Sequence, residues 1–283
     1  MVRKKNVYRT RKRKKKSFNS LIIFWWMFLF VKFVLSIPFY IVNWIVILVD
    51  KSKKKDEEEK VMNKRGLINP LYSKFNLVKK ISGDFDKWEE KMMKSESIIG
   101  IVLGARGTGK SAIALKVFEN LYKKMNMKLY AIGFNKSEMP SWVEVIDSID
   151  KIKNNSHILI DEGGILFSSR SSMSKPNKLL SELMLIARHK NLSILFISQN
   201  SSNLEVNILR QADYLILKPS SLLQKSFERK IIKELYTETQ KDFNEFKSDK
   251  GITYIHSDLF TGFVSNPLPS FWNTSISKSW GKK

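Results

Sequence analysis

One eight-residue pattern constrains the fold of this chain more than any other feature. Residues 104–111 read Gly-Ala-Arg-Gly-Thr-Gly-Lys-Ser, a complete match to G-x-x-x-x-G-K-[ST]. The apolar run at 98–103 predicts a buried strand before the pattern, and residues 112–124 follow it with a helical period. Such a loop occurs between a strand and a helix. The sequence therefore predicts an α/β domain built around this loop.

The residue types of the loop suit the binding of phosphate. Glycines let the backbone pass close to phosphate oxygens, so that successive N–H groups and the helix N-terminus face the negative charge. We expect Lys110 to neutralise the β- and γ-phosphates of ATP, and the hydroxyl of Ser111 to bind Mg²⁺. The predicted nucleotide-binding residues are Gly104, Ala105, Arg106, Gly107, Thr108, Gly109, Lys110, Ser111 and Ala112.

A second apolar run, residues 157–160, ends in two acids, Asp161 and Glu162. At the carboxyl end of a strand, Asp161 is expected to bind the water shell of Mg²⁺, so Ser111 and Asp161 are the predicted metal ligands. Glu162 is expected to polarise the attacking water. The pair thus predicts a site for nucleotide hydrolysis.

Further strands complete the predicted sheet. Residues 192–198 form an apolar run that ends at Gln199, whose amide is the predicted sensor of the γ-phosphate. Runs at 128–134 and 213–218 bring the expected strands to about five, alternating with helices. The predicted fold is a P-loop NTPase of the RecA/ASCE-like kind, with a mostly parallel sheet and flanking helices.

The motifs exclude several other classes of phosphate-loop protein. A GTPase needs Asn-Lys-x-Asp after its Asp-x-x-Gly, but the near match at residues 135–138 comes earlier and ends in glutamate. No Leu-Ser-Gly-Gly-Gln of an ABC transporter subunit and no arginine-rich lid of a small-molecule kinase is evident. The chain has no cysteine, and its histidines lie too far apart for a zinc site. A Mg²⁺-dependent ATPase remains.

The first fifty residues differ in composition from the rest. Residues 1–17 contain ten Lys and Arg and no acid, whereas residues 18–50 are rich in Phe, Trp, Ile and Val. Because a bilayer span needs about 20 apolar residues, this stretch predicts a membrane anchor. Pro38 near its middle favours a hairpin over a single tilted span, and basic residues on both sides place both ends in the cytoplasm. The basic arm fits either anionic lipid or nucleic acid.

The sequence predicts five parts. They are the basic cytoplasmic arm 1–17, the membrane anchor 18–50, a linker 51–93, the ATPase core 94–220 and a C-terminal extension 221–283. The extension is expected to contain two charged helices, a β-hairpin over 252–264 and an aromatic tail that docks on the core or on a neighbouring subunit. The net charge of +23 favours polyanionic partners, and +13 of it lies after residue 50.

Two stretches resemble the FtsK/HerA group of DNA-pumping ATPases. They are residues 161–170 and the run from Ala187-Arg188-His189 to Ser198-Gln199-Asn200, within a resemblance that covers residues 98–218. Within the group, the motifs are most similar to viral genome-packaging ATPases and to zonula occludens toxin-like morphogenesis ATPases of phages and archaeal mobile elements. The resemblance implies a homo-oligomeric ring in which an arginine reaches the neighbour's γ-phosphate. Arg170, Arg188 and Arg210 are the candidates.

The resemblance leaves several functions open. The first is ATP-driven movement of DNA through or towards a membrane, for genome packaging, virion extrusion or conjugative transfer. The second is a membrane-bound ATPase that assembles virion or secretion-channel proteins without moving DNA, and a partitioning or regulatory ATPase is a third. The expected location is a membrane, with the ATPase domain facing the cytoplasm and with membrane lipids, ATP and Mg²⁺ as ligands.

Overall fold

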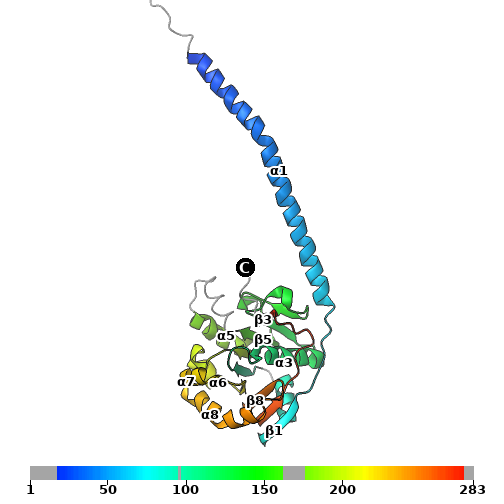
Figure 1. Cartoon of the computed structure of the whole chain (residues 1–283), viewed down its shortest axis with the longest axis vertical. Helices are drawn as coiled ribbons and strands as arrows, with labels where there is room; N and C mark the ends of the chain where they lie inside the picture. Colours follow the sequence, from blue (N-terminus) through cyan, green and yellow to red (C-terminus); the bar gives the residue numbers. More distant parts are fainter. Residues whose placement is uncertain (1–17, 95–96, 162–175, 277–283) are drawn as a thin grey trace, which may run out of the picture. The chain divides into compact units, whose positions relative to one another are not determined.

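The computed structural model describes residues 18–94, 97–161 and 176–276, and it divides into two compact units, Met1–Lys60 and Val61–Lys283. The first unit contains most of helix α1, Phe18–Gly66, a single helix of 49 residues (Figure 1). The helix continues through Pro38, so the hairpin turn predicted at this proline is wrong. Proline removes one N–H donor and crowds the carbonyl four residues earlier, and a long helix absorbs this defect locally when the turns on both sides keep their bonds.

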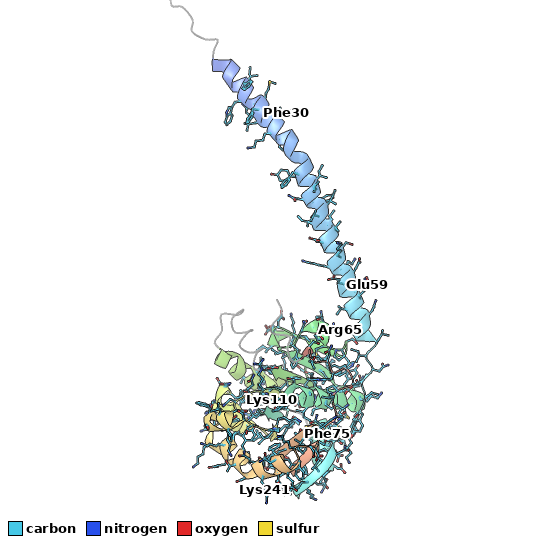
Figure 2. The ribbon with its side chains drawn as sticks, viewed as in Figure 1. Phe30, Glu59, Arg65, Phe75, Lys110 and Lys241 are labelled. Atoms are coloured by element: carbon cyan, nitrogen blue, oxygen red, sulfur yellow. The ribbon has the colours of Figure 1, made fainter. Side chains whose placement is uncertain are left out.

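Most of the α1 surface between Ile23 and Val49 is apolar. Twenty large apolar side chains between Ile23 and Val49 are exposed, Phe30 among them (Figure 2). Across the described residues, no helix combines the length and the apolar character needed to cross a membrane. The membrane anchor over residues 18–50 stays a prediction.

The second unit is built on one mixed sheet of nine strands in the order β1-β9-β8-β7-β2-β6-β5-β3-β4. The strands are β1 Asn76–Gly83, β2 Ile99–Leu103, β3 Lys128–Ile132, β4 Val143–Val145, β5 Ser156–Asp161, β6 Ser193–Ile197, β7 Tyr214–Leu217, β8 Ile252–Ser257 and β9 Phe260–Ser265. The strands from β7 to β4 are parallel, while β8, β9 and β1 extend the sheet in antiparallel fashion. Strands β2, β3, β5, β6 and β7 and the β8–β9 hairpin lie where the sequence predicted them.

Helices cover both faces of this sheet. They are α2 Phe85–Lys94, α3 Lys110–Met125, α5 Pro176–Lys190, α6 Val206–Gln211, α7 Leu222–Phe227 and α8 Lys230–Glu245, with short 3₁₀ turns at Lys136–Glu138, Ile149–Lys151 and Ser201–Asn203. Helices α2 and α3 contribute side chains such as Trp88 and Phe118 to one core cluster. Helices α5, α6 and α8 contribute side chains such as Leu183 and Tyr236 to the other. The result is the three-layer α/β architecture expected of a parallel sheet.

The region 76–94, which the sequence predicted to be linker, belongs to the folded unit. Strand β1 pairs with β9 at the sheet edge, and most of its side chains are exposed, two adjacent lysines included. Helix α2 buries Phe85, Trp88 and Met92 in the core. Charged residues on an edge strand hide the alternation that marks a strand and also prevent pairing with other chains. This is why the sequence pattern gave no strand here.

The aromatic tail after β9 docks on the core, one of the two places expected for it. Phe271 and Trp272 pack against the cluster that contains α3. The ring of Phe271 meets that of Trp142 edge-on, with centroids 5.3 Å apart. The Ser270 N–H donates to the Glu119 carboxylate at 3.1 Å. The tail therefore closes one face of the core in the same chain.

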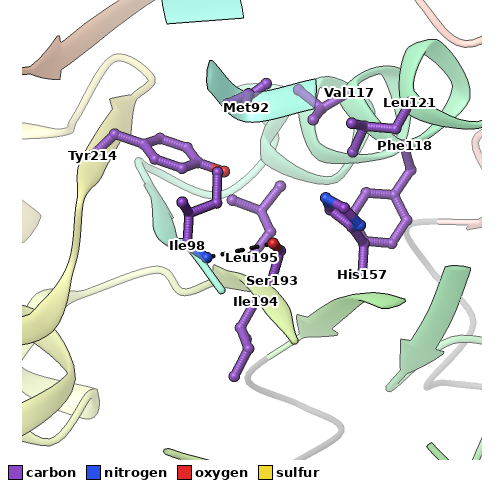
Figure 3. Close-up of a pocket in the computed structure, with 10 residues that line it drawn as sticks. All are labelled: Met92, Ile98, Val117, Phe118, Leu121, His157, Ser193, Ile194, Leu195 and Tyr214. Atoms are coloured by element: carbon purple, nitrogen blue, oxygen red, sulfur yellow. Dashed lines mark hydrogen bonds between the residues drawn. The ribbon is translucent and has the colours of Figure 1, made fainter. Parts of the chain in front are cut away.

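A buried histidine lies in a small pocket near the amino ends of the central strands. His157, in β5, lines this pocket with Phe118, Ser193 and Tyr214 (Figure 3). Its side chain is buried, and neither ring nitrogen has a hydrogen-bond partner among the described residues. Burial lowers the pKa of His157 to about 4, because the charged imidazolium would lose its hydration. The folded state therefore holds a neutral imidazole.

This histidine should make the fold sensitive to acid. Its folded-state pKa of about 4 lies below the ordinary value of 6.5, so its contribution is complete above pH 6.5 and is lost as the pH falls towards 4. We expect this group to remove about 3 kcal/mol of unfolding free energy between pH 7 and pH 4. Denaturant titrations of wild type and His157→Leu at both pH values measure it. A His189→Leu control should behave as wild type, and an equal acid loss in His157→Leu would contradict the assignment.

Candidate nucleotide-binding site

The glycine-rich loop joins the carboxyl end of β2 to the first residue of α3, Lys110, as the sequence predicted. Gly104, Gly107 and Gly109 have positive φ angles of 152°, 79° and 91°. Residues with a Cβ rarely adopt such angles, so the loop's path depends on its glycines. Gly109 is the N-cap of α3 and has no side chain to cover the first-turn amides. Loop and helix therefore present backbone N–H groups, which suits a phosphate.

Lys110 is held over the loop. Its side chain is only 9% exposed, and its Nζ donates to the carbonyls of Gly104 and Ala105, each at 2.9 Å. The hydroxyl of Thr108 also donates to the Ala105 carbonyl, at 2.7 Å. Ser111 follows, half-buried, in the first turn of α3. The loop is thus ordered by its own side chains around one ammonium group.

The register of the parallel strands brings Asp161 level with the loop. Val102 in β2 pairs with Ile197 in β6, and Ile197 pairs with Asp161 at the end of β5. Because neighbouring strands lie about 4.8 Å apart, Asp161 and Val102 are separated by roughly 10 Å across β6. Asp161 is half-buried at the same edge of the sheet as Ser111. A hydroxyl and a carboxylate at this edge are ligands that Mg²⁺ accepts, directly or through water.

The residues present fit a Mg²⁺-nucleotide better than an independent metal centre. No group of three or more His, Cys, Asp or Glu side chains able to hold an ion occurs in the described parts of the chain. Mg²⁺ bound with a nucleotide needs few protein ligands, since phosphate oxygens and waters supply the rest. Ser111 and Asp161 are therefore sufficient protein partners for such an ion.

Gln199 lies where the sequence predicted a sensor. It follows β6, the strand between the loop strand β2 and the Asp161 strand β5. The preceding residue is fixed, since the Ser198 N–H donates to the Val102 carbonyl at 3.0 Å. The Gln199 side chain is exposed, and its backbone carbonyl accepts a hydrogen bond from the Gln224 amide of α7. Gln199 is thus at the edge where a γ-phosphate would lie.

Other predicted residues are not brought together at this edge. Glu162 and Arg170 lie outside the described residues. Arg188 is in the last turn of α5, just before β6 begins, and Arg210 is in α6, just before β7 begins. Both arginines are exposed, and both lie near the amino ends of the strands, opposite the loop. The fold thus places neither arginine beside the phosphate loop in the sequence of strand ends that carries Asp161 and Gln199.

The remaining loop residues differ in exposure. Arg106 and Gly107 are exposed, Gly104 and Ala112 are buried, and Ala105, Thr108 and Gly109 are intermediate. Lys218 and Pro219, which follow β7, support this loop, and the sequence pattern did not predict that role. The Pro219 carbonyl accepts from the Ala105 N–H at 3.0 Å. A lysine that ends an apolar strand, before a proline, was the available signal.

Comparisons with known proteins give matches among solved structures. No protein-family model matches the chain, and a search of curated proteins found no match. Among solved structures, the chain is similar to the DNA-packaging ATPase B204 of Sulfolobus turreted icosahedral virus, with 16% identity over 62% of this chain and 99% of that chain and a TM-score of 0.43. The genome packaging NTPase B204 of Sulfolobus turreted icosahedral virus 2, in complex with AMPPCP, shares 15% identity over 61% of this chain and 98% of that chain, with a TM-score of 0.43.

A conjugation protein is also similar to the chain. The pCW3 conjugation coupling protein TcpA, with ATPγS, shares 13% identity over 63% of this chain and 61% of that chain, with a TM-score of 0.45. Since each TM-score is below 0.5, we base the function on the phosphate loop itself. This loop lies between β2 and α3 at the carboxyl edge of the parallel strands, and β6 separates β2 from β5.

Two glycine substitutions in the loop should differ in effect. A Cβ added at Gly104 would lie 2.6 Å from the Lys218 Cβ, whereas one added at Gly107 meets no atom within 4 Å. Both alanines are strained by a positive φ, at about 1–2 kcal/mol. Only Gly104→Ala adds a clash, worth about 1–3 kcal/mol more. Chemical denaturation and binding of a fluorescent ATP analogue should rank Gly104→Ala below Gly107→Ala in both stability and affinity; equal losses would contradict this.

Proposed function

We propose that this protein is a Mg²⁺-dependent ATPase that uses ATP hydrolysis to move DNA. The observation that carries the proposal is the arrangement at the carboxyl edge of the sheet. There, Lys110 is held over a glycine loop, and Asp161 lies in register two strands away. A loop of backbone amides with one lysine suits a triphosphate, and a strand-end carboxylate beside it suits the accompanying cation.

In the proposed mechanism, each side chain acts on a different part of the nucleotide. Lys110 binds the β- and γ-phosphates, and Ser111 and Asp161 hold the cation. Mg²⁺, when bound, neutralises charge that develops on the phosphate oxygens. Glu162, next to Asp161 in the chain, accepts a proton from the attacking water, and Gln199 orients the γ-phosphate from the end of β6.

DNA is the proposed cargo because of charge and of the sequence motifs. The chain carries a net charge of +23, and +13 of it remains after the first fifty residues. Such an excess attracts the phosphate backbone without regard to base sequence, as a translocating protein requires. The stretches that contain Arg188 and Gln199 resemble those of DNA-pumping ATPases. Packaging, virion extrusion and conjugative transfer all use this activity.

The proposal includes a ring of identical subunits. Arg188 and Arg210 are exposed on the edge of the sheet opposite to their own phosphate loop. An arginine that stabilises transition-state charge has to approach the γ-phosphate closely. Either residue can therefore act only from a neighbouring subunit, and Arg170 remains a third candidate.

We also propose that residues 18–50 hold the protein at a membrane, with the ATPase unit on the cytoplasmic side, where ATP is available. The support is the row of exposed apolar side chains on α1 between Ile23 and Val49. Apolar surface of this extent favours burial away from water, at about 25 cal/mol per Å². The basic arm before it would add attraction to anionic lipids.

The motor proposal predicts ATP hydrolysis that DNA stimulates. We expect the full chain to release phosphate from MgATP faster when double- or single-stranded DNA is added. Lys110→Ala and Glu162→Gln should each lower the rate about 100-fold or more, since they remove phosphate binding and water activation. Phosphate release assays with and without DNA measure this.

The outcomes separate the alternatives. A matched control, Lys241→Ala, changes an exposed lysine of α8 far along the chain from the loop and should retain the wild-type rate. Hydrolysis that ignores DNA would favour a virion- or channel-assembly ATPase. No ATP binding at all by the wild type, or full activity in Lys110→Ala, would refute the ATPase proposal.

The membrane proposal predicts flotation with lipid. The full chain should float with vesicles of phosphatidylcholine and phosphatidylserine on a density gradient, whereas a chain that begins at Val61 should stay at the bottom. A full-length variant with Lys12 to Lys16 replaced by serine should still float at high salt, because apolar contact does not depend on charge. Flotation of the chain beginning at Val61, or none by the full chain, would contradict the assignment.

A further inference from the structure

Lys218 is a buried lysine that the proposed mechanism does not use. It follows directly after β7, and its N–H donates to the carbonyl of Leu103, the last residue of β2 before the phosphate loop, at 2.8 Å. Its side chain is only 1% exposed. No carboxylate of the described residues lies within ion-pair distance of it. A lysine in such a place needs an explanation, since burial of an unpaired ammonium costs free energy.

The aliphatic part of the Lys218 side chain packs against the backbone of the phosphate loop, and this contact surface is called the floor of the loop below. A Cβ on Gly104 would come within 2.6 Å of the Lys218 Cβ, so the loop backbone runs in close contact with the lysine stem. The Lys218 Cε lies 3.9 Å from the corresponding position at Gly109. The stem thus passes beneath the loop from its first glycine to its last. The next residue, Pro219, accepts the Ala105 N–H.

The other end reaches the open end of the β8–β9 hairpin. Lys218 Nζ donates to the carbonyls of Gly251 and Ile252 at 2.9 and 3.0 Å, and to Asn266 Oδ1 at 2.8 Å. Gly251 directly precedes β8, Ile252 is its first residue and Asn266 directly follows β9, so the three oxygens lie together at the open end of the hairpin. Three acceptors match the three protons of an ammonium group.

We propose that Lys218 is a positioning residue of the nucleotide site, which ties the floor of the phosphate loop to the open end of the β8–β9 hairpin and so sets the loop geometry for nucleotide binding. This inference rests on the proposed ATPase function. The β8–β9 hairpin then supports the nucleotide site through Lys218. Among the residues that the structure describes, no hydrogen bond joins the hairpin directly to the glycines of the loop. In this proposal Lys110 binds the nucleotide, whereas Lys218 packs against the loop backbone and holds it to the hairpin.

The charge of Lys218 supplies a readout that a purely structural contact lacks. Burial lowers the pKa of Lys218 to about 7. The groups that face its side chain come from Gly104, Gly109, Gly251, Ile252 and Asn266, none of which titrates. Below pH 7 the ammonium satisfies all three acceptors, and above it the neutral amine has only two protons to donate. The tie should therefore weaken as the pH rises through 7.

The test compares ATP hydrolysis by four full-length proteins: wild type, Lys218→Met, Asn266→Ala and a matched surface control, Lys241→Met. Lys218→Met keeps the stem under the loop and removes the amine. We expect it to raise KM for ATP about tenfold while kcat stays within about twofold, because nucleotide binding and not the chemical step is affected. Asn266→Ala, which removes one acceptor far from the loop, should raise KM less. Lys241→Met should match the wild type.

Two further measurements complete the test. The double variant Lys218→Met/Asn266→Ala should have the KM of Lys218→Met alone, since both changes break the same tie. The KM advantage of the wild type over Lys218→Met should be largest at pH 6 and should shrink by pH 8. Thermal unfolding shows which variants are folded, and if Lys218→Met is not, Asn266→Ala decides by the same criteria.

The results that overturn the inference differ from those that overturn the ATPase proposal. An unchanged KM in folded Lys218→Met or, failing that, in Asn266→Ala would refute the role of Lys218. A wild-type pH profile parallel to that of Lys218→Met would refute it as well. By contrast, a wild type that binds no ATP refutes the ATPase itself. Loss of activity in Lys110→Ala together with normal activity in Lys218→Met leaves the ATPase intact and removes only this inference.

Discussion

The structure depends on one constraint: at Gly104, directly after β2, the chain passes so close to Lys218 that only glycine fits. Strand β2 is buried between β6 and β7, and the loop that follows it rests on Lys218 at the end of β7. Because parallel strands end at one edge, the same burial that holds β2 also brings the ends of β5, β6 and β7 beside the loop. The order of the strands therefore places Asp161, Gln199 and Lys218 beside the phosphate loop.

Features that local pattern determines were predictable from the sequence. The strand, loop and helix around Lys110 have a distinct glycine spacing and two hydrophobic periods, and the structure has all three in place. The β8–β9 hairpin and the strand that ends at Asp161 were equally marked by apolar runs next to turns or acids. In each case a short segment carries the whole signal, so no knowledge of distant contacts is needed.

Features that depend on distant contacts were not predictable. Strand β1 exposes its lysines and becomes a strand only because β9, almost two hundred residues later, offers it an edge. Pro38 favoured a turn, yet the surrounding residues keep α1 continuous. Lys218 looked like the polar end of a strand, and its acceptors come from residues 33 to 48 positions further along the chain. Glu162 lies outside the described residues, so its role stays a prediction.

The far side of α3 explains why the phosphate loop can be held in one geometry. Lys116 and Glu119 form an ion pair with 2.7 Å between Nζ and Oε2, and both side chains are almost completely buried. Glu119 also accepts the N–H groups of Leu71 and Ser270, and Lys116 donates to the Leu71 carbonyl. A buried pair is tolerated when such bonds satisfy its remaining atoms. These bonds fix α3 to Leu71, which precedes the core in the sequence, and to Ser270, which follows it. The helix cannot shift without breaking them, so its N-terminal amides keep their direction at the phosphate loop.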